Sequence, residues 1–226
     1  VIPLTETLTS IIKLCEDSMG TPVEIEFAVN LGDREPLPAE LYILQVRPMI
    51  TSSLNSDTNI DEKEIENALC YSTFVMGNGK IDGIRDIVYV KKKDFNQSKT
   101  GSIALEIAEI NRFLVEKKMH YLLIAPGRIG TYDPWLGIPL RWEHVSGARV
   151  FVESEYPGRF IEPSQGSHFF QNITSLGIGY FSAVSSNDSC FVDEQWLDSL
   201  DPVRETAFVK HIHLDSDLRI RINSRA

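Results

Sequence analysis

Short extended runs of β-branched and aromatic residues recur along this chain, and they constrain its fold more than any other feature. Runs of this kind, bounded by Gly, Pro or polar residues, are typical of strands. Among them are VEIEFAV (23–29), ELYILQVRP (40–48), YLLIA (121–125), ARVFVE (148–153) and GYFSAV (179–184). Long stretches with helical spacing of apolar residues are fewer, at 5–19 and 102–118. Because the helices and strands follow no strict βαβ repeat, we expect an α/β fold whose sheet order the sequence leaves open.

Charge and cysteine content narrow the class of protein. The 226 residues include 22 basic and 32 acidic side chains, for a formal net charge of -10. This acidic balance argues against nucleic acid or an anionic membrane as a partner. Three widely spaced cysteines favour a reducing compartment over a disulfide framework. With no apolar run of membrane-spanning length, we expect a cytoplasmic protein.

The polar, acidic segment TSSLNSDTNIDEKEIE suggests a division of the chain into two parts. Before it, residues 1–50 hold a helix and a two-stranded hairpin. Residues 51–69 are then a linker or a solvated helix, and 70–226 form an α/β domain. The chain starts at Val1 without a Met and stops soon after its last expected strand. We therefore expect it to be a fragment of a longer protein.

Alternation along the hairpin collects polar side chains on one face. Glu24 and Glu26 share a face of the first strand, and Gln45 and Arg47 share a face of the second. A carboxylate and an amide oxygen suit Mg²⁺, and a guanidinium binds phosphate with two hydrogen bonds. A solvated face with a Glu–Arg cross-strand pair is the alternative, and the pattern alone does not separate the two.

These two runs resemble the end of the ATP-grasp nucleotide-binding domain of phosphoenolpyruvate synthase and pyruvate phosphate dikinase. The family pattern is an Ile-Glu-Phe or Ile-Glu-Trp strand followed by a Leu-Gln-x-Arg strand, here IEF at 25–27 and LQVR at 44–47. The resemblance implies that Glu26 and Gln45 hold the metal of the nucleotide and that Arg47 contacts its phosphates. It covers about the first 50 residues, and the rest of an ATP-grasp domain is absent.

His168 is a candidate phosphate carrier. It follows Gly166-Ser167 at the start of a candidate short helix, SHFFQNITSLG. A neutral imidazole is a nucleophile, and the N–H groups at a helix N-terminus stabilise a phosphoryl group. A partly buried core histidine beside two Phe residues is the alternative.

The surroundings of His168 are similar to the swivelling phosphohistidine domain of the same dikinases. There the carrier lies in a Gly-Gly-x-Thr-Ser/Cys-His-Ala-Ala stretch with a Leu-Gly-Ile eight residues on, and here Leu176-Gly177-Ile178 begins eight residues after His168. The upstream order of strand, Trp-containing loop and strand also fits. The chain departs from the pattern at Gln165 and Gly166, and at Phe169 and Phe170, which replace the two small Ala residues.

The resemblance implies an enzyme, an ATP-dependent phosphotransferase that moves a phosphoryl group from Mg·ATP through His168 to an acceptor such as pyruvate. ATP and Mg²⁺ would be its cofactors, and its partners would be a small-molecule acceptor and further domains of the same longer chain. The fragment alone would be inactive. The alternative is a regulatory or nucleotide-sensing relative that kept the fold and lost phosphotransfer.

Three further patterns have weaker functional interpretations. The Gly-rich loop at 124–142 either cradles an anion with the amides around Arg128 or is a structural turn. His211 and His213 share a strand face, which permits a metal pair, but no third ligand is evident in the sequence and a surface face is the favoured interpretation. Lys91 to Lys93 are most simply a solvated strand end.

Overall fold

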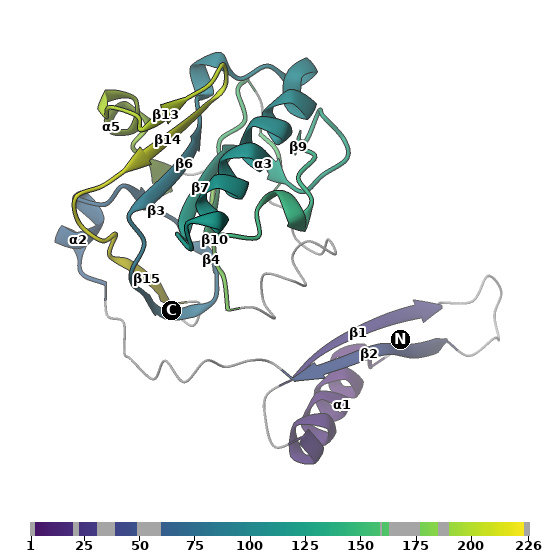
Figure 1. The fold of residues 1–226 in the computed structure, drawn as a ribbon. Helices are drawn as coiled ribbons and strands as arrows, with labels where there is room; N and C mark the ends of the chain where they lie inside the picture. Colours follow the sequence, from purple (N-terminus) through teal and green to yellow (C-terminus); the bar gives the residue numbers. More distant parts are fainter. Residues whose placement is uncertain are drawn as a thin grey trace. The chain divides into compact units, whose positions relative to one another are not determined.

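The computed structural model describes residues 3–19, 23–30, 39–48, 60–158, 160–162, 177–184 and 190–223. The chain divides into two compact units, Val1–Ser52 and Ser53–Ala226. The first unit is a helix with a two-stranded hairpin, and the second contains all the other elements (Figure 1).

The first unit has the helix and the hairpin that the sequence predicts. The helix α1 spans Leu4–Met19, and the strands β1 (Val23–Asn30) and β2 (Glu40–Pro48) pair antiparallel. α1 packs on β1, where Val23 is buried. The opposite sides of both strands are more exposed, which is the usual consequence of period-two alternation in a strand covered on one face.

A seven-stranded mixed sheet forms the centre of the second unit, in the order β13-β14-β6-β7-β10-β11-β4. The four middle strands β6, β7, β10 and β11 run parallel, and the outer strands pair antiparallel. The strand bounds are β4 Phe74–Met76, β6 Asp86–Val90, β7 Tyr121–Pro126, β10 Ala148–Ser154, β11 Gly179–Ala183, β13 Arg204–Glu205 and β14 Val209–His213. The expected mixed α/β class is confirmed at this level.

Smaller elements surround this sheet. Three two-stranded ladders, β12-β3, β15-β5 and β8-β9, accompany short helices. The bounds of these elements, and of the one long helix α3 of this unit's described part, are as follows: α2 Glu62–Glu66, β3 Cys70–Tyr71, β5 Asn78–Ile81, η1 Lys92–Asp94, η2 Gln97–Lys99, α3 Thr100–Glu116, β8 Arg128–Ile129, β9 Gly137–Ile138, η3 Trp142–His144, β12 Phe191–Val192, α5 Glu194–Ser199 and β15 Ile220–Asn223. No helix in the described ranges is both long and apolar enough to cross a membrane.

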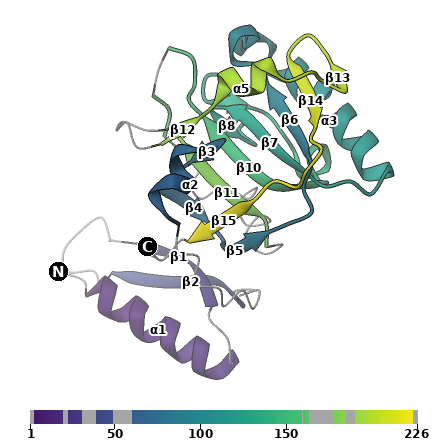
Figure 2. The same cartoon turned by 90° about the vertical axis from the view of Figure 1, so that its left-hand side faces the viewer.

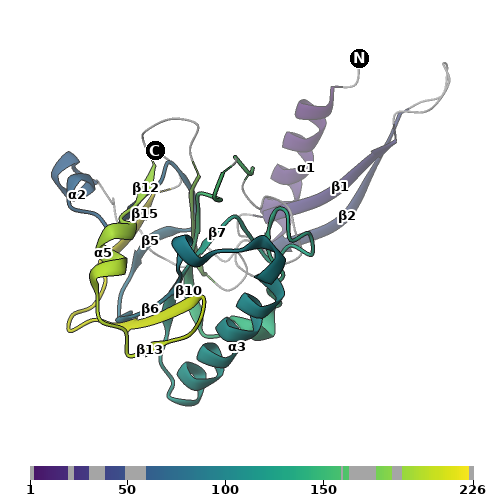
Figure 3. The ribbon, with the colours of Figure 1, turned by 90° about the horizontal axis from the view of Figure 1, so that it is seen from above.

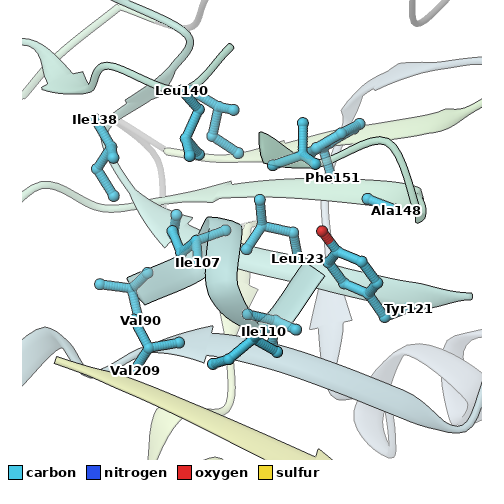
Figure 4. Close-up of a cluster of buried hydrophobic side chains, with 14 of the residues drawn as sticks. Val90, Ile107, Ile110, Tyr121, Leu123, Ile138, Leu140, Ala148, Phe151 and Val209 are labelled. Carbon is cyan, nitrogen blue, oxygen red and sulfur yellow. The ribbon is translucent and has the colours of Figure 1, made fainter. Parts of the chain in front are cut away.

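The long helix α3 covers one face of the sheet, while α2, α5 and the β15-β5 ladder lie on the other (Figures 2 and 3). The apolar stripe that predicts this helix is fully buried against the sheet: Ile103, Ile107, Ile110 and Leu114. Figure 4 shows Ile107 and Ile110 among side chains of the central strands. Burial of each such side chain stabilises the fold by about 1.5–3 kcal/mol.

The end of α3 is fixed by a left-handed residue. Lys118 has φ 57°. Its N–H donates to the carbonyl of Val115 at 2.9 Å, and the N–H of Met119 donates to the carbonyl of Leu114 at 2.9 Å. These two bonds satisfy helix-end carbonyls in the Schellman pattern, and Met119 packs against the core just beyond. The turn directs the chain into β7.

Candidate functional site

The carboxyl ends of the parallel strands β6, β7, β10 and β11 meet at one edge of the sheet. In open α/β sheets, ligands bind in the crevice beyond this edge, because loops from neighbouring strands converge there. The residues at or just after these strand ends include Lys91, Gly127, Glu153 and Ala183. We therefore take this edge as the candidate site.

A buried carboxylate lies at the end of β10. Glu153 is 0% exposed; it accepts a hydrogen bond from the N–H of Ile129 at 2.8 Å and one from the hydroxyl of Tyr180 at 2.7 Å. A buried carboxylate needs such donors to offset the loss of hydration. Sequence reasoning missed Glu153 as a functional residue. The sequence feature that could have identified this residue is its position as an acidic side chain at the end of the apolar run ARVFVE.

Ser182 is the neighbour of Glu153 in the β10-β11 ladder. Ladder partners share a sheet face, and both residues are fully buried. Within the described part of the chain, the Ser182 hydroxyl has no hydrogen-bond partner. A buried hydroxyl without a hydrogen-bond partner lowers the stability of the fold. Folding therefore does not explain why this hydroxyl lies beside a buried carboxyl group, and we include the pair in the candidate site.

The lysines after β6 are ion-paired, which corrects the expectation of a solvated strand end. Lys91 is only 5% exposed, and its ammonium donates to Glu205 at 2.9 Å and pairs with Asp94 at 3.2 Å. Burial lowers the pKa of Lys91, but the bonds to these two carboxylates outweigh burial and raise it overall. Lys92 pairs with Glu155 at 3.0 Å and with Glu194 of α5 at 3.2 Å. These charges are therefore neutralised within the fold.

The backbone N–H groups of the Gly-rich loop donate hydrogen bonds to backbone carbonyls of the protein itself. The N–H of Gly127 donates to the carbonyl of Ser154, that of Arg128 to Leu136, and that of Gly130 to Ile138, at 2.8–3.0 Å. The structural interpretation of this loop therefore holds, and the anion-cradle interpretation is wrong for these amides. The backbone also approaches closely here: a Cβ built on Gly137 would lie 1.9 Å from the carbonyl oxygen of Arg128. Only glycine fits that contact.

His168 lies within residues 163–176, outside the described residues, as do Phe169 and Phe170. In the order of the chain it falls between Ser154, the last residue of β10, and Gly179, the first residue of β11.

The hairpin of the first unit places the four polar residues on one face, as alternation predicts, and its register shifts between Glu26 and Phe27. Glu26 is the cross-strand partner of Gln45, and Glu24 that of Arg47, so all four residues lie on one face. Glu26 and Gln45 are exposed, and the side chain of Arg47 lies outside the described residues. One carboxylate and one amide oxygen on adjacent strands fit Mg²⁺, which binds few protein oxygens and leaves positions for phosphate and water.

A second polar cluster lies at the opposite end of the sheet. Asp86 is buried at the start of β6; His211 Nε2 and His213 Nδ1 lie 2.7 and 3.0 Å from the same carboxylate oxygen. His211 is itself 1% exposed, so the surface interpretation of this histidine pair is wrong for one of its members. Burial raises the pKa of Asp86, and the hydrogen bonds of the two histidines lower it by more, so the net pKa lies below its usual range.

No relative emerges from comparison with known proteins: no family model matches the chain, and no curated protein or solved structure is significantly similar to it. The dikinase resemblance therefore remains a prediction from short motifs. Among the described residues, no three His, Cys, Asp or Glu side chains form a group that could hold a metal ion.

We expect the Asp86→Asn variant to lose about 1–3 kcal/mol of stability at neutral pH, because the buried His211 and the exposed His213 lose their charged acceptor. A carboxylate with a lowered folded pKa stabilises above its unfolded pKa and loses that effect as the pH falls. The difference between wild type and variant should therefore shrink below about pH 4. Urea denaturation at several pH values measures it.

Asp217→Asn is the matched control, because Asp217 pairs with Arg85 on the surface. Exposed pairs contribute about 0–1 kcal/mol, so this variant should change stability little at any pH. Equal losses for Asp86→Asn and Asp217→Asn would contradict the role given to the buried cluster.

Proposed function

We propose that this chain is part of an ATP-dependent phosphotransferase of the phosphoenolpyruvate synthase and pyruvate phosphate dikinase type. His168 carries a phosphoryl group from Mg·ATP to a small-molecule acceptor such as pyruvate. In this proposal the unit Ser53–Ala226 is the phosphohistidine-like domain, and the unit Val1–Ser52 is the end of an ATP-grasp domain.

One observation carries the proposal: the connection that contains His168 leaves the sheet at the carboxyl end of β10, beside the buried pair of Glu153 and Ser182. Catalytic groups of open α/β domains lie on such connections, because the strands hold their starting points rigidly. The carboxyl edge also holds the buried carboxyl group of Glu153 and the buried hydroxyl of Ser182, which has no hydrogen-bond partner among the described residues.

The chemistry at His168 is two nucleophilic displacements. In the first, an unprotonated imidazole nitrogen forms a bond to phosphorus as the bond between phosphorus and the oxygen of the leaving nucleotide product breaks. In the second, an acceptor oxygen attacks the same phosphorus as the nitrogen–phosphorus bond breaks. When the acceptor is pyruvate, its methyl group loses a proton to solvent and the enolate oxygen forms the new bond to phosphorus. The histidine returns to its initial, unphosphorylated state and can begin another turnover.

The hairpin face binds the nucleotide in this proposal. Glu26 and Gln45 hold the metal, and Arg47 contacts the phosphates. When bound, Mg²⁺ neutralises phosphate charge and orients the transferred group. The exposure of Glu26 and Gln45 and their cross-strand pairing support this assignment.

A specific observation favours a second candidate, a nucleotide-sensing relative without phosphotransfer. Lys91 and Lys92, the cations nearest the carboxyl edge of β6, are both paired with carboxylates. The group buried at the same edge, Glu153, is a carboxyl group and not a cation. A phosphoryl group arriving there would meet fewer free positive charges than phosphate sites usually provide.

The intact mass of the full-length protein after incubation with Mg·ATP tests the proposal. The sample is kept at neutral to alkaline pH, because phosphohistidine is labile in acid. We expect the mass to increase by one phosphoryl group, and the increase to disappear when Mg²⁺ is chelated or pyruvate is added. A preparation that binds ATP but gains no mass would support the sensing alternative instead.

A further inference from the structure

A pocket of about 900 Å³ opens on the sheet face opposite α3. The helix α2, the strand β3 and the strand β15 surround it, and Figure 2 shows these elements in front of the central strands. Its volume lies within the range of about 300–1,000 Å³ that is usual for small-molecule sites. The described residues that line the pocket include none of the residues to which phosphotransfer is assigned, so the inference goes beyond the proposed function.

The floor of the pocket is apolar. Leu122, Val150 and Val152 lie beneath it and are almost fully buried in the core. The apolar surface that the pocket presents comes from partly buried side chains packed over this core: Leu69, Phe181 and Leu218. The thiol of Cys70 contributes to the wall, and burial, with a smaller effect of Cys190, raises its pKa to about 12. This thiol is therefore uncharged at neutral pH, and the floor offers no charged group to a ligand.

The rim of the pocket carries free positive charge. Lys63 and Arg219 are exposed, and neither side chain forms an ion pair with any described residue. The acidic residues of the rim are occupied: Asp61 accepts a hydrogen bond from the N–H of Glu64 at 2.8 Å, and Glu64 pairs with Arg221 at 2.8 Å. The rim therefore presents two cations without an ion-pair partner among the described residues, next to an apolar surface.

From this combination we infer that the pocket binds an amphiphilic carboxylate, with its hydrocarbon tail against Leu69, Phe181 and Leu218 and its carboxylate at Lys63 and Arg219. Burial of a tail supplies affinity in proportion to the apolar area removed from water. The unpaired cations select an anionic head over a neutral one, because charge-assisted hydrogen bonds are about twice as strong as neutral ones.

Calorimetric titration of the full-length protein with decanoate, decanol and decylamine tests this inference. We expect decanoate to bind at one site and at least about tenfold more tightly than either of the others. The double variant Lys63→Gln/Arg219→Gln should reduce decanoate affinity about tenfold and leave decanol affinity unchanged. Its matched control is Lys99→Gln/Lys118→Gln, which removes two exposed cations away from the pocket.

Filling the pocket is an independent test. Ala68 lines the pocket and is partly exposed, so Ala68→Leu fills space that the tail would occupy and should weaken decanoate binding. Circular dichroism checks that the variant folds. If Ala68→Leu does not fold, the rim variant alone decides, because its two side chains are exposed. The inference is overturned if decanoate does not bind, if decanol binds equally well, or if both double variants weaken decanoate by the same factor. None of these outcomes depends on phosphorylation of His168.

Discussion

The His168→Ala variant is expected to take up no phosphoryl group from Mg·ATP, while the wild-type protein takes up one. Alanine has no atom that can attack phosphorus, so the covalent intermediate cannot form and labelling should fall to background rather than by a modest factor. Intact-mass measurement of both proteins, at a pH that preserves phosphohistidine, gives the comparison directly. Transfer to the acceptor should be lost together with labelling, because the proposed route passes through this residue.

Two controls separate the loss of a nucleophile from general damage. His120→Ala removes an exposed histidine whose ring nitrogen lies 3.3 Å from the carbonyl of Gly147, and it should label like the wild type. Nucleotide binding by His168→Ala should also be unchanged, because the proposed nucleotide contacts are Glu26, Gln45 and Arg47. Labelling of His168→Ala at the wild-type level would remove this residue from the mechanism and leave the carrier elsewhere in the protein.

Local patterns in the sequence predict most of the secondary structure. The stripe of Ile103, Ile107, Ile110 and Leu114 predicts both the helix α3 and its buried face, because helical spacing puts all four on one side. Alternation in the hairpin predicts that Glu26 and Gln45 share a face, and the register confirms it. Sheet order was not predictable, because the pairing of β6 with β14, for example, joins residues far apart in the chain.

Pairing between distant segments also explains what sequence reasoning missed at the sites. Lys91 is buried because Glu205, on a strand more than a hundred residues away, supplies its charge partner. His211 is buried next to Asp86, which lies on the adjacent strand β6 more than a hundred residues earlier in the chain. Periodicity assigns a residue to a face of its own element, but it does not say which partner covers that face. For this reason the burial of a charged residue near a strand end, such as Lys91, could not be predicted from the sequence.

The Ile107→Ala variant should lose about 2–5 kcal/mol of stability, the range expected when a fully buried Ile is truncated in a core that relaxes only in part. Ile107 is 0% exposed in the middle of α3, between the helix and the central strands, as Figure 4 shows. Urea denaturation followed by circular dichroism measures the loss. Alanine favours helix more than isoleucine does, so helix propensity does not contribute to the destabilisation.

Leu105→Ala is the control for Ile107→Ala on the same helix. Leu105 is 68% exposed, so truncating it removes little buried surface and creates no cavity, and the expected change lies within about 0.5 kcal/mol. The two variants shorten side chains of similar size two residues apart, so their difference isolates burial against the sheet. A similar loss for both would mean that α3 does not cover the sheet as described. A loss for Ile107→Ala alone would confirm the packing that fixes β6, β7 and β10, and with them the edge from which the His168 connection starts.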